Sequence, residues 1–222
     1  MKAFQYKPNL KRTAVLLFGI MMSCATVKAQ DTPCLPSHGE TNNQPAWCGI
    51  EQVIALAEGA NWVSFYVDIT LDELKAALAA ASPDASIKIS GQNSSTTYVP
   101  RTHRWSGNLQ WDLAQMYKIR VADACEISLE GMPIDPAEHP VTIVNGANYI
   151  AFPLTENMSL TDAFAGFAVN GDKILSQNST ATYNRGRWQG QGLTNLEPGK
   201  GYIYKSNVQG DRTLVFPLNA KK

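Results

Sequence analysis

Large apolar side chains recur at every second residue in several short stretches, which predicts β-strands with one buried face. The pattern is clear at 54–56 and again at 141–143, and a period of two is typical of strands. A second apolar run follows each stretch, at 62–67 and at 149–152. A Glu-Gly or Asn-Gly dipeptide separates the two runs, and such dipeptides favour tight turns. We therefore expect each pair of runs to form a hairpin.

One stretch has helical periodicity instead. Thr70–Leu78 places leucines at i, i+3 and i+7, and its first Thr is followed by Glu three residues on, which is the signature of a capping box. Pro83 and Asp84 end this pattern, and a weaker version of it occurs at 159–164. We expect one short helix in each half of the chain.

Further strands are predicted after each helix. Residues 87–91 and 173–177 lead into polar Gln-Asn-Ser runs. Tyr183–Trp188 then has the pattern of a tight hairpin, because its central Gly can adopt a positive φ while Tyr and Trp flank the turn on paired strands. The last strands of each half are expected at 116–121, 126–129, 202–205 and 214–216.

The two halves repeat each other in sequence. NSTATYNRGRWQG at 178–190 resembles NSSTTYVPRTHRWSG at 93–107, and other matching blocks lie 85 to 87 residues apart. A repeat at a fixed period predicts two copies of one structural unit. We expect module 1 at 50–134 and module 2 at 139–218.

The first 29 residues have the pattern of a signal peptide. Four basic residues precede an apolar run at 14–22, and Val27-Lys28-Ala29 provides the small residues expected before cleavage at Gln30. A lipoprotein acylated at Cys24 is the alternative. The apolar run is short for a membrane span, so we expect a mature chain without a transmembrane segment, either secreted, at the cell surface or in the periplasm.

Removal of this leader changes the charge of the chain. The leader contains five of the 19 basic residues and none of the 19 acidic ones, so the mature chain has a formal net charge of −5. No run of basic residues is evident in the sequence. Because proteins that bind nucleic acid gather phosphates with such a basic stripe, we expect no nucleic-acid partner.

Three cysteines follow the leader. Cys34 and Cys48 are expected to form a disulfide that closes a Pro-, Asn- and Gly-rich loop at 30–49, because exported proteins meet oxidising conditions. Cys125 is then a buried or half-buried strand thiol or, alternatively, an intermolecular disulfide or reactive nucleophile. The cysteines lack zinc-type spacing, so we expect no metal and no cofactor.

No catalytic residue set is expected. The three histidines, at 38, 103 and 139, have no motif around them. Asp72 and Glu73 are adjacent carboxylates, but the dipole of a helix explains them in its first turn. Glycine-rich nucleotide loops and nucleophile elbows do not occur in the sequence. An uncharacterised hydrolase is the remaining enzymatic alternative.

Several motifs occur in one order in both halves. Gly-Ala-Asn-aromatic is followed by a short Leu/Asp helix, Lys-Ile-x-x-Gln-Asn-Ser and Tyr-x-x-x-x-Trp-x-Gly, and the second copy ends with Leu-Glu-Pro-Gly-Lys-Gly-Tyr. This order resembles a tandem β-rich module of secreted and surface proteins of the Bacteroidota, over nearly all of 50–218. The resemblance implies a place beside adhesion-type or carbohydrate-handling domains and no catalytic residues. The first copy departs from the pattern at 109–116.

The repeated Arg-Trp pair is the clearest binding signal. Trp105 and Trp188 recur beside an arginine and near an Asn-, Ser- and Thr-rich stretch, and exposed aromatic rings with neighbouring amides suit stacking against sugars. The alternative is that each Trp packs against the Tyr on the paired strand as part of the core. The candidate ligand-binding residues are Trp105, Trp188, Tyr98, Tyr183, Arg104, Arg187, Asn93 and Asn178.

These patterns predict a mainly β fold, with β-sandwich-like or α+β modules that each contain one short helix. The functional hypothesis is an exported, non-catalytic binding or adhesion protein, which recognises a glycan or a host or cell-surface partner through the hairpins that carry Trp and Tyr. The alternative is a structural or assembly component of an extracellular or cell-envelope structure, whose sheet edges pair with neighbours and which self-associates.

Overall fold

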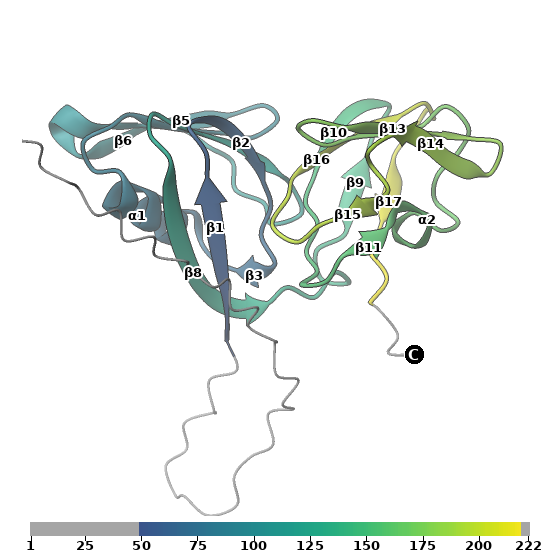
Figure 1. Ribbon diagram of the computed structural model, residues 1–222, viewed down its shortest axis with the longest axis horizontal. Helices are drawn as coiled ribbons and strands as arrows, with labels where there is room; N and C mark the ends of the chain where they lie inside the picture. The colour runs from purple at the N-terminus through teal and green to yellow at the C-terminus, as the bar shows by residue number, and fades with distance from the viewer. Residues whose placement is uncertain (1–48, 219–222) are drawn as a thin grey trace, which may run out of the picture. The chain divides into compact units, whose positions relative to one another are not determined.

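Strands dominate residues 49–218, the part of the chain that the computed structural model describes (Figure 1). The predicted signal peptide and the predicted Cys34–Cys48 disulfide lie outside these residues. The mainly β prediction is confirmed. Among the described residues, none of the helices has the length and apolar character needed to cross a membrane.

A five-stranded antiparallel sheet forms most of module 1. Its members alternate buried and exposed residues, as expected for strands with one face toward a core. In order of hydrogen bonding, the strands are β2 (Gly59–Val63), β7 (Tyr117–Val121), β4 (Ile87–Ser90), β5 (Ser95–Val99) and β6 (Arg104–Gly107). The helical turn η1 (Pro100–Thr102) connects β5 to β6.

A second five-stranded antiparallel sheet occupies the corresponding part of module 2. Its order of strands is β10 (Gly146–Ile150), β16 (Tyr202–Ser206), β12 (Lys173–Leu175), β13 (Thr180–Asn184) and β14 (Arg187–Gln191). Each strand stands at the sequence position that the alignment of the two halves gives it. Lys88 pairs with Arg120 in the first sheet, and Lys173 pairs with Lys205 in the second. The two sheets therefore share one topology.

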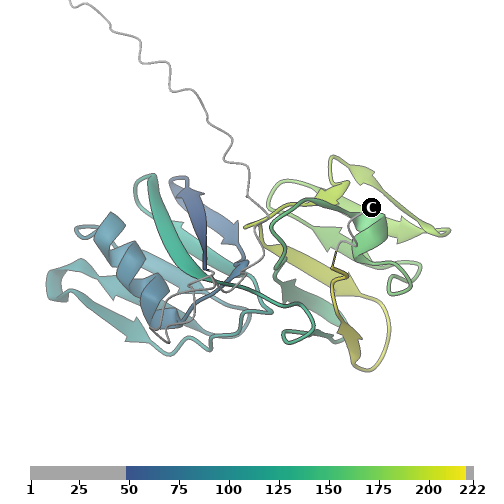
Figure 2. The ribbon, with the colours of Figure 1, turned by 90° about the horizontal axis from the view of Figure 1, so that it is seen from below.

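Other strands and a helix cover one face of each five-stranded sheet (Figure 1). In Figure 2, which is seen from below, the blue helix of module 1 lies across its sheet. The covering elements of module 1 are β1 (Ile50–Leu56), β3 (Val67–Asp68), α1 (Leu71–Ala81) and β8 (Cys125–Pro133). Those of module 2 are β9 (Val141–Ile143), β11 (Met158–Ser159), α2 (Leu160–Ala163), β15 (Asn195–Leu196) and β17 (Arg212–Leu214).

Each module has its own hydrophobic core between the sheet and this covering layer. Fully buried members include Phe65, Leu74 and Ile119 in module 1, and Phe152 and Ile174 in module 2. Burial of one such side chain stabilises the fold by about 1.5–3 kcal/mol. The buried faces of the strands are therefore fixed, and their opposite faces point to solvent.

The predicted hairpin between the first two runs of each module is wrong. β1 pairs with β8, whereas β2 pairs with β7 in the other sheet. The Asn61 side chain explains the corner, because its amide oxygen accepts from the Ala57 N–H at 2.9 Å and its nitrogen donates to the Ala57 carbonyl at 2.8 Å. Asn148 makes the same two bonds with Val144, both at 2.9 Å. These side chains satisfy the backbone at the point where the chain changes sheets.

Other local predictions are confirmed. Thr70 caps α1 and forms the expected capping box with Glu73, and α2 is a shorter helix capped by Ser159. The hairpin between β13 and β14 has a two-residue turn in which Arg185 and Gly186 have φ values of 52° and 77°. Two successive positive φ values are characteristic of a type I′ turn.

Two equivalent glutamines join the modules. Gln177 of module 2 donates to the Ala60 carbonyl at 2.8 Å and accepts from the Trp62 N–H at 3.0 Å. Gln92 of module 1 makes the same pair of bonds with module 2, at 3.1 Å to the Ala147 carbonyl and 2.7 Å from the Tyr149 N–H. Each side chain thus satisfies the free edge of the other module's sheet, which would otherwise offer unpaired backbone groups.

Backbone contacts at the boundary are also reciprocal. The Ser64 N–H donates to the Gly199 carbonyl, and the Ala151 N–H donates to the Ala114 carbonyl, each at 3.0 Å. These four residues are two equivalent pairs in the alignment of the modules. Such a pattern, in which i contacts j and j contacts i, is that of a two-fold symmetric interface. These contacts are two-fold related, whereas the bond from the Gly201 N–H to the Trp62 carbonyl, at 3.1 Å, occurs on one side only among the described residues.

We predict that replacing both glutamines by Ala lowers the free energy of unfolding by about 2 kcal/mol, because each loses two hydrogen bonds that contribute roughly 0.5–1.5 kcal/mol apiece. Urea unfolding measures this change. Gln189→Ala is the control, because Gln189 lies on an exposed sheet face away from the boundary. A double variant as stable as the control would show that the glutamines do not hold the modules together.

Candidate functional site

The hairpin aromatics of module 1 face the core rather than solvent. Tyr98 and Trp105 are directly paired across β5 and β6, with ring centroids 5.4 Å apart. Tyr98 is only 3% exposed, and it pairs with buried Ile87 on its other side. Its hydroxyl lies 3.0 Å from Nδ1 of His103. The half-buried Trp105 packs on the core and borders a shallow surface hollow beside α1.

The aromatics of module 2 are arranged in the same way. Tyr183 and Trp188 are paired across β13 and β14 with ring centroids 5.3 Å apart. Trp188 also lies against Phe164 at 5.4 Å and Tyr204 at 6.5 Å. Its indole N–H is buried and has no hydrogen-bond partner among the described residues. For both tryptophans the geometry favours the packing alternative.

The predicted arginines lie on the opposite, solvent-facing side of the same strands. Arg104 precedes Trp105 and Arg187 precedes Trp188, and alternation along a strand places such neighbours on opposite faces. Both arginines are exposed. The structure therefore separates the Arg-Trp pairs that the sequence groups together.

The solvent-facing sides of the two sheets are cationic. No strand of either five-stranded sheet contains Asp or Glu, and within the described residues none of their basic side chains forms an ion pair. All but Lys118 are exposed, and Lys118 is half-buried. The seven basic residues, here called the cationic face, are Lys88, Arg104, Lys118, Arg120, Lys173, Arg187 and Lys205.

The cations of this face come together only in the folded sheets. Lys88 and Arg120 are distant in sequence, but they are cross-strand partners in the first sheet. Lys173 and Lys205 are the equivalent partners in the second. Because the cations alternate with buried or half-buried residues along their strands, no basic run appears in the sequence, and only the sheet brings the charges together. The sequence does contain a signal for these cations, because a basic residue recurs after 85 positions: Lys88 matches Lys173, and Arg120 matches Lys205.

Acidic residues gather on other strands. β1, β3 and β8 contain Glu51, Asp68, Glu126 and Glu130 but no Lys or Arg. The charges of module 1 are thus segregated, with cations on one sheet and carboxylates on the other. Segregation of this kind raises the local potential over the cationic face although the whole chain is not basic.

Lys118 stands at the centre of the cationic face, where the modules meet. Its Nζ lies 4.7 Å from the ring centroid of Trp62 in its own module and 4.9 Å from that of Tyr149 in module 2. Trp62 and Tyr149 are equivalent residues of the two modules. Cation–π contacts at these distances are attractive, and they add to the glutamine bonds at the boundary.

The predicted asparagines line two cavities at the module boundary. Asn178 borders a cavity of about 620 Å³ together with Trp62, and Asn93 borders one of about 290 Å³ together with Tyr149. Both asparagines are exposed and stand in equivalent turns. The structure does not bring them together with Trp105 or Trp188.

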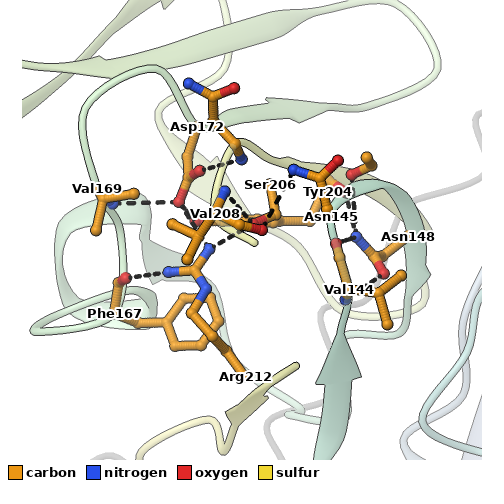
Figure 3. A network of polar contacts seen from close by, with 12 residues as sticks. Val144, Asn145, Asn148, Phe167, Val169, Asp172, Tyr204, Ser206, Val208 and Arg212 are labelled. Atoms are coloured by element: carbon orange, nitrogen blue, oxygen red, sulfur yellow. Dashed lines mark hydrogen bonds and ion pairs between the residues drawn. The ribbon is translucent and has the colours of Figure 1, made fainter. Parts of the chain in front are cut away.

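A buried ion pair holds the loops of module 2 (Figure 3). Asp172 is 0% exposed and accepts from Nη2 of Arg212 at 3.0 Å and from the Tyr204 hydroxyl at 2.5 Å. Burial by itself would raise the pKa of the Asp172 carboxyl. Hydrogen bonds from Tyr204, two backbone amides and Arg212 outweigh it and hold that pKa below its ordinary value. Burial and the neighbouring carboxylate raise the pKa of Tyr204.

Module 1 has no such ion pair at the equivalent place. Ile87, Ile119 and Cys125 occupy the positions of Asp172, Tyr204 and Arg212. Since an apolar cluster serves the same part of the fold, the ion pair is a structural feature of module 2. Arg212 also bonds the Phe167 carbonyl at 2.8 Å, which ties the loop after α2 to β17.

Groups suited to catalysis are sparse in the described residues. No three His, Cys, Asp or Glu side chains within 49–218 are placed to hold a metal ion. Cys125 is half-buried and forms no disulfide there. Burial, followed by the charge of Asp123, raises the pKa of its thiol, so it stays protonated at neutral pH and is a poor nucleophile.

Comparisons of this chain with protein-family models, with curated proteins and with solved structures find no match. The resemblance to a module of the Bacteroidota stays a prediction. The candidate functional site therefore rests on the geometry, which offers the cationic face and the two boundary cavities.

We predict that Trp188→Ala lowers the free energy of unfolding by about 3 kcal/mol, because removal of a core-facing Trp leaves a cavity beside Phe164 and Tyr204. Thermal or urea unfolding measures the loss. The neighbouring Arg187→Ala is the control and is expected to stay within about 0.5 kcal/mol of the parent, as exposed substitutions usually do. Unchanged stability of the Trp188 variant would contradict its place in the core.

We also predict that Asp172→Asn lowers the free energy of unfolding by about 3 kcal/mol at pH 7, because it leaves the largely buried Arg212 charge without its carboxylate partner. The folded-state pKa of Asp172 is lowered, so its contribution is present above the unfolded pKa of about 3.9 and is lost as pH falls through the folded value. Urea unfolding of both proteins from pH 7 downwards should show the difference shrink in acid. The exposed Asp211→Asn is the control, and a pH-independent difference would refute the assignment.

Proposed function

We propose that this chain is an exported, non-catalytic binding protein that holds an acidic polysaccharide on its cationic face. One observation carries the proposal: the strands of both five-stranded sheets present seven basic side chains and no carboxylate. Excess positive charge without internal partners favours an external anion. Predicted export places the ligand outside the cytoplasm, and acidic polysaccharides are anionic polymers of that environment.

The two modules contribute matching half-sites to this face. Lys88 and Arg120 of module 1 correspond to Lys173 and Lys205 of module 2. A single exposed ion pair contributes little, about 0–1 kcal/mol. Two half-sites within one chain act together on a polymer, because the second contact is intramolecular once the first has formed. A polymer with a repeating acidic unit can therefore contact the half-sites of both modules at once.

Polar side chains between the cations support a carbohydrate ligand. Thr97 and Ser106 are cross-strand partners beside Lys88, and Thr182 and Gln189 are the equivalent partners beside Lys173. Hydroxyls and amides both donate and accept hydrogen bonds, as recognition of sugar hydroxyls requires. The aromatic rings of the hairpins, which would stack on bases, face inward instead.

An assembly role is the second candidate, and the sheet edges favour it. β6 and β14 end the order of strands in their sheets and pair with no further strand among the described residues. Such edges can accept a strand from another molecule. Each begins with an arginine, at 104 and 187, so two copies of this chain would bring like charges together. Edge pairing therefore fits an acidic partner strand better than self-association.

We predict that removing the central cations weakens binding to polygalacturonate at least tenfold in 50 mM NaCl. It should also make the affinity less dependent on salt concentration, because a protein that makes fewer ionic contacts releases fewer counterions on binding. Titration calorimetry of the chain beginning at Gln30 measures both effects. The variant carries four substitutions: Lys88→Gln, Arg120→Gln, Lys173→Gln and Lys205→Gln.

Lys75→Gln is the matched control, since Lys75 lies on α1 outside the cationic face. It is expected to bind as the parent does. Dextran, a neutral polymer, should bind neither protein. If the parent protein binds single-stranded DNA but not polygalacturonate, the ligand of the cationic face is nucleic acid and the polysaccharide proposal is wrong. If it binds neither polymer, the proposal is also overturned.

A further inference from the structure

We propose that the larger boundary cavity is a subsite for a single acidic sugar ring, such as a uronate. The inference rests on the proposed function and names where one sugar of the polysaccharide is held. The cavity has a volume of about 620 Å³, which lies in the range of small-molecule sites, about 300–1,000 Å³. It lies between the β1–β2 corner of module 1 and two loops of module 2.

The lining supplies the three kinds of group that an acidic sugar needs. Trp62 offers an aromatic surface, Asn178 an amide and Lys200 a cation. Lys200 and Asn178 are exposed, and neither side chain has a hydrogen-bond or ion-pair partner among the described residues. Glu197 lines the same cavity and can accept hydrogen bonds from sugar hydroxyls.

Two residues that line the cavity are glycines in a left-handed backbone conformation. Gly192 and Gly199 have φ values of 81° and 74°, a conformation that favours glycine over other residues. A side chain at 192 would meet Ser179, and one at 199 would meet Gln52. The Glu-Pro-Gly-Lys-Gly segment can therefore turn tightly, and this turn places Lys200 at the cavity.

The smaller cavity is the natural comparison within the chain. It has a volume of about 290 Å³ and is lined by Tyr149, Asn93 and Gln115, the equivalents of Trp62, Asn178 and Lys200. Its position 115 has no charge, and Ala114 stands where the larger cavity has Gly199. The amide and the aromatic ring recur, but the cation and the space do not.

This asymmetry assigns the acidic-sugar subsite to one side of the boundary only. A carboxylate gains an ionic partner from Lys200 but would meet only a neutral amide at Gln115. The pyranose ring can lie against Trp62, in the way that apolar sugar faces pack on aromatic rings. The sequence contains this signal as Gly-Lys-Gly in the second copy against Ala-Gln-Met in the first.

The test uses the chain beginning at Gln30 with trigalacturonate as the probe and neutral galactotriose as its comparison. Tryptophan fluorescence and titration calorimetry should both report binding of trigalacturonate. Lys200→Gln and Trp62→Ala should each weaken that binding at least tenfold. Lys200→Gln should remove the preference for trigalacturonate over galactotriose. The control variant at the smaller cavity, Gln115→Ala, should change affinity less than twofold.

Each outcome separates this subsite from the cationic face. If trigalacturonate binds the parent but Lys200→Gln binds it equally well, the subsite is wrong while the proposed function stands. If the variant with four substitutions in the cationic face binds polygalacturonate with the affinity of the parent, the proposed function is wrong instead. Lys200→Gln replaces an exposed side chain and should fold normally. It therefore tests the subsite by itself even if Trp62→Ala destabilises the protein.

Discussion

Reciprocal closure of two sheet edges is the constraint on which the rest of the structure depends. β2 and β10 each present unpaired backbone groups at the module boundary, and Gln177 and Gln92 satisfy them from the opposite module. Because both bonds come from equivalent residues, one interface satisfies two edges at once. It also brings the solvent-facing sides of both sheets to the boundary, where Lys118 contacts an aromatic ring from each module. The two boundary cavities are lined by residues of both modules and depend on this contact.

How far the sequence predicts the structure depends on the range of the interaction. The capping box of Thr70 with Glu73 and the turn at Arg185 and Gly186 involve neighbouring residues, so the sequence contains all of the physics that fixes them. The expected hairpin at Gly59 failed because the Asn61 side chain replaces backbone pairing at that corner. A turn dipeptide specifies a reversal of the chain but not the strand with which the chain then pairs.

The candidate site was hidden for a related reason. Trp105 and Arg104 are adjacent in sequence, and the pair suggested one binding site, yet a strand places neighbours on opposite faces. The tryptophan joined the core and the arginine joined a surface whose other members come from distant strands. Strand pairing, which sequence periodicity does not reveal, decides which cations meet. The asparagines lie at equivalent positions of the two modules, but the sequence pattern indicates only strand residues for their cavity neighbours Trp62 and Tyr149.

The two modules share an order of strands but differ in the side chains at equivalent positions. An apolar cluster around Ile87 suffices in module 1, whereas module 2 fills the same place with Asp172 and Arg212. Such a buried pair is weak as a source of stability, since its desolvation offsets its attraction, so it serves better to fix loop geometry. The ion pair joins the loop at 167–172 to the segment at 206–212, whereas the larger cavity is lined by other segments of module 2, at 176–179 and 192–202. The two differences are therefore separate, and because both lie in side chains and connecting loops, the order of strands that the two sheets share stays unchanged.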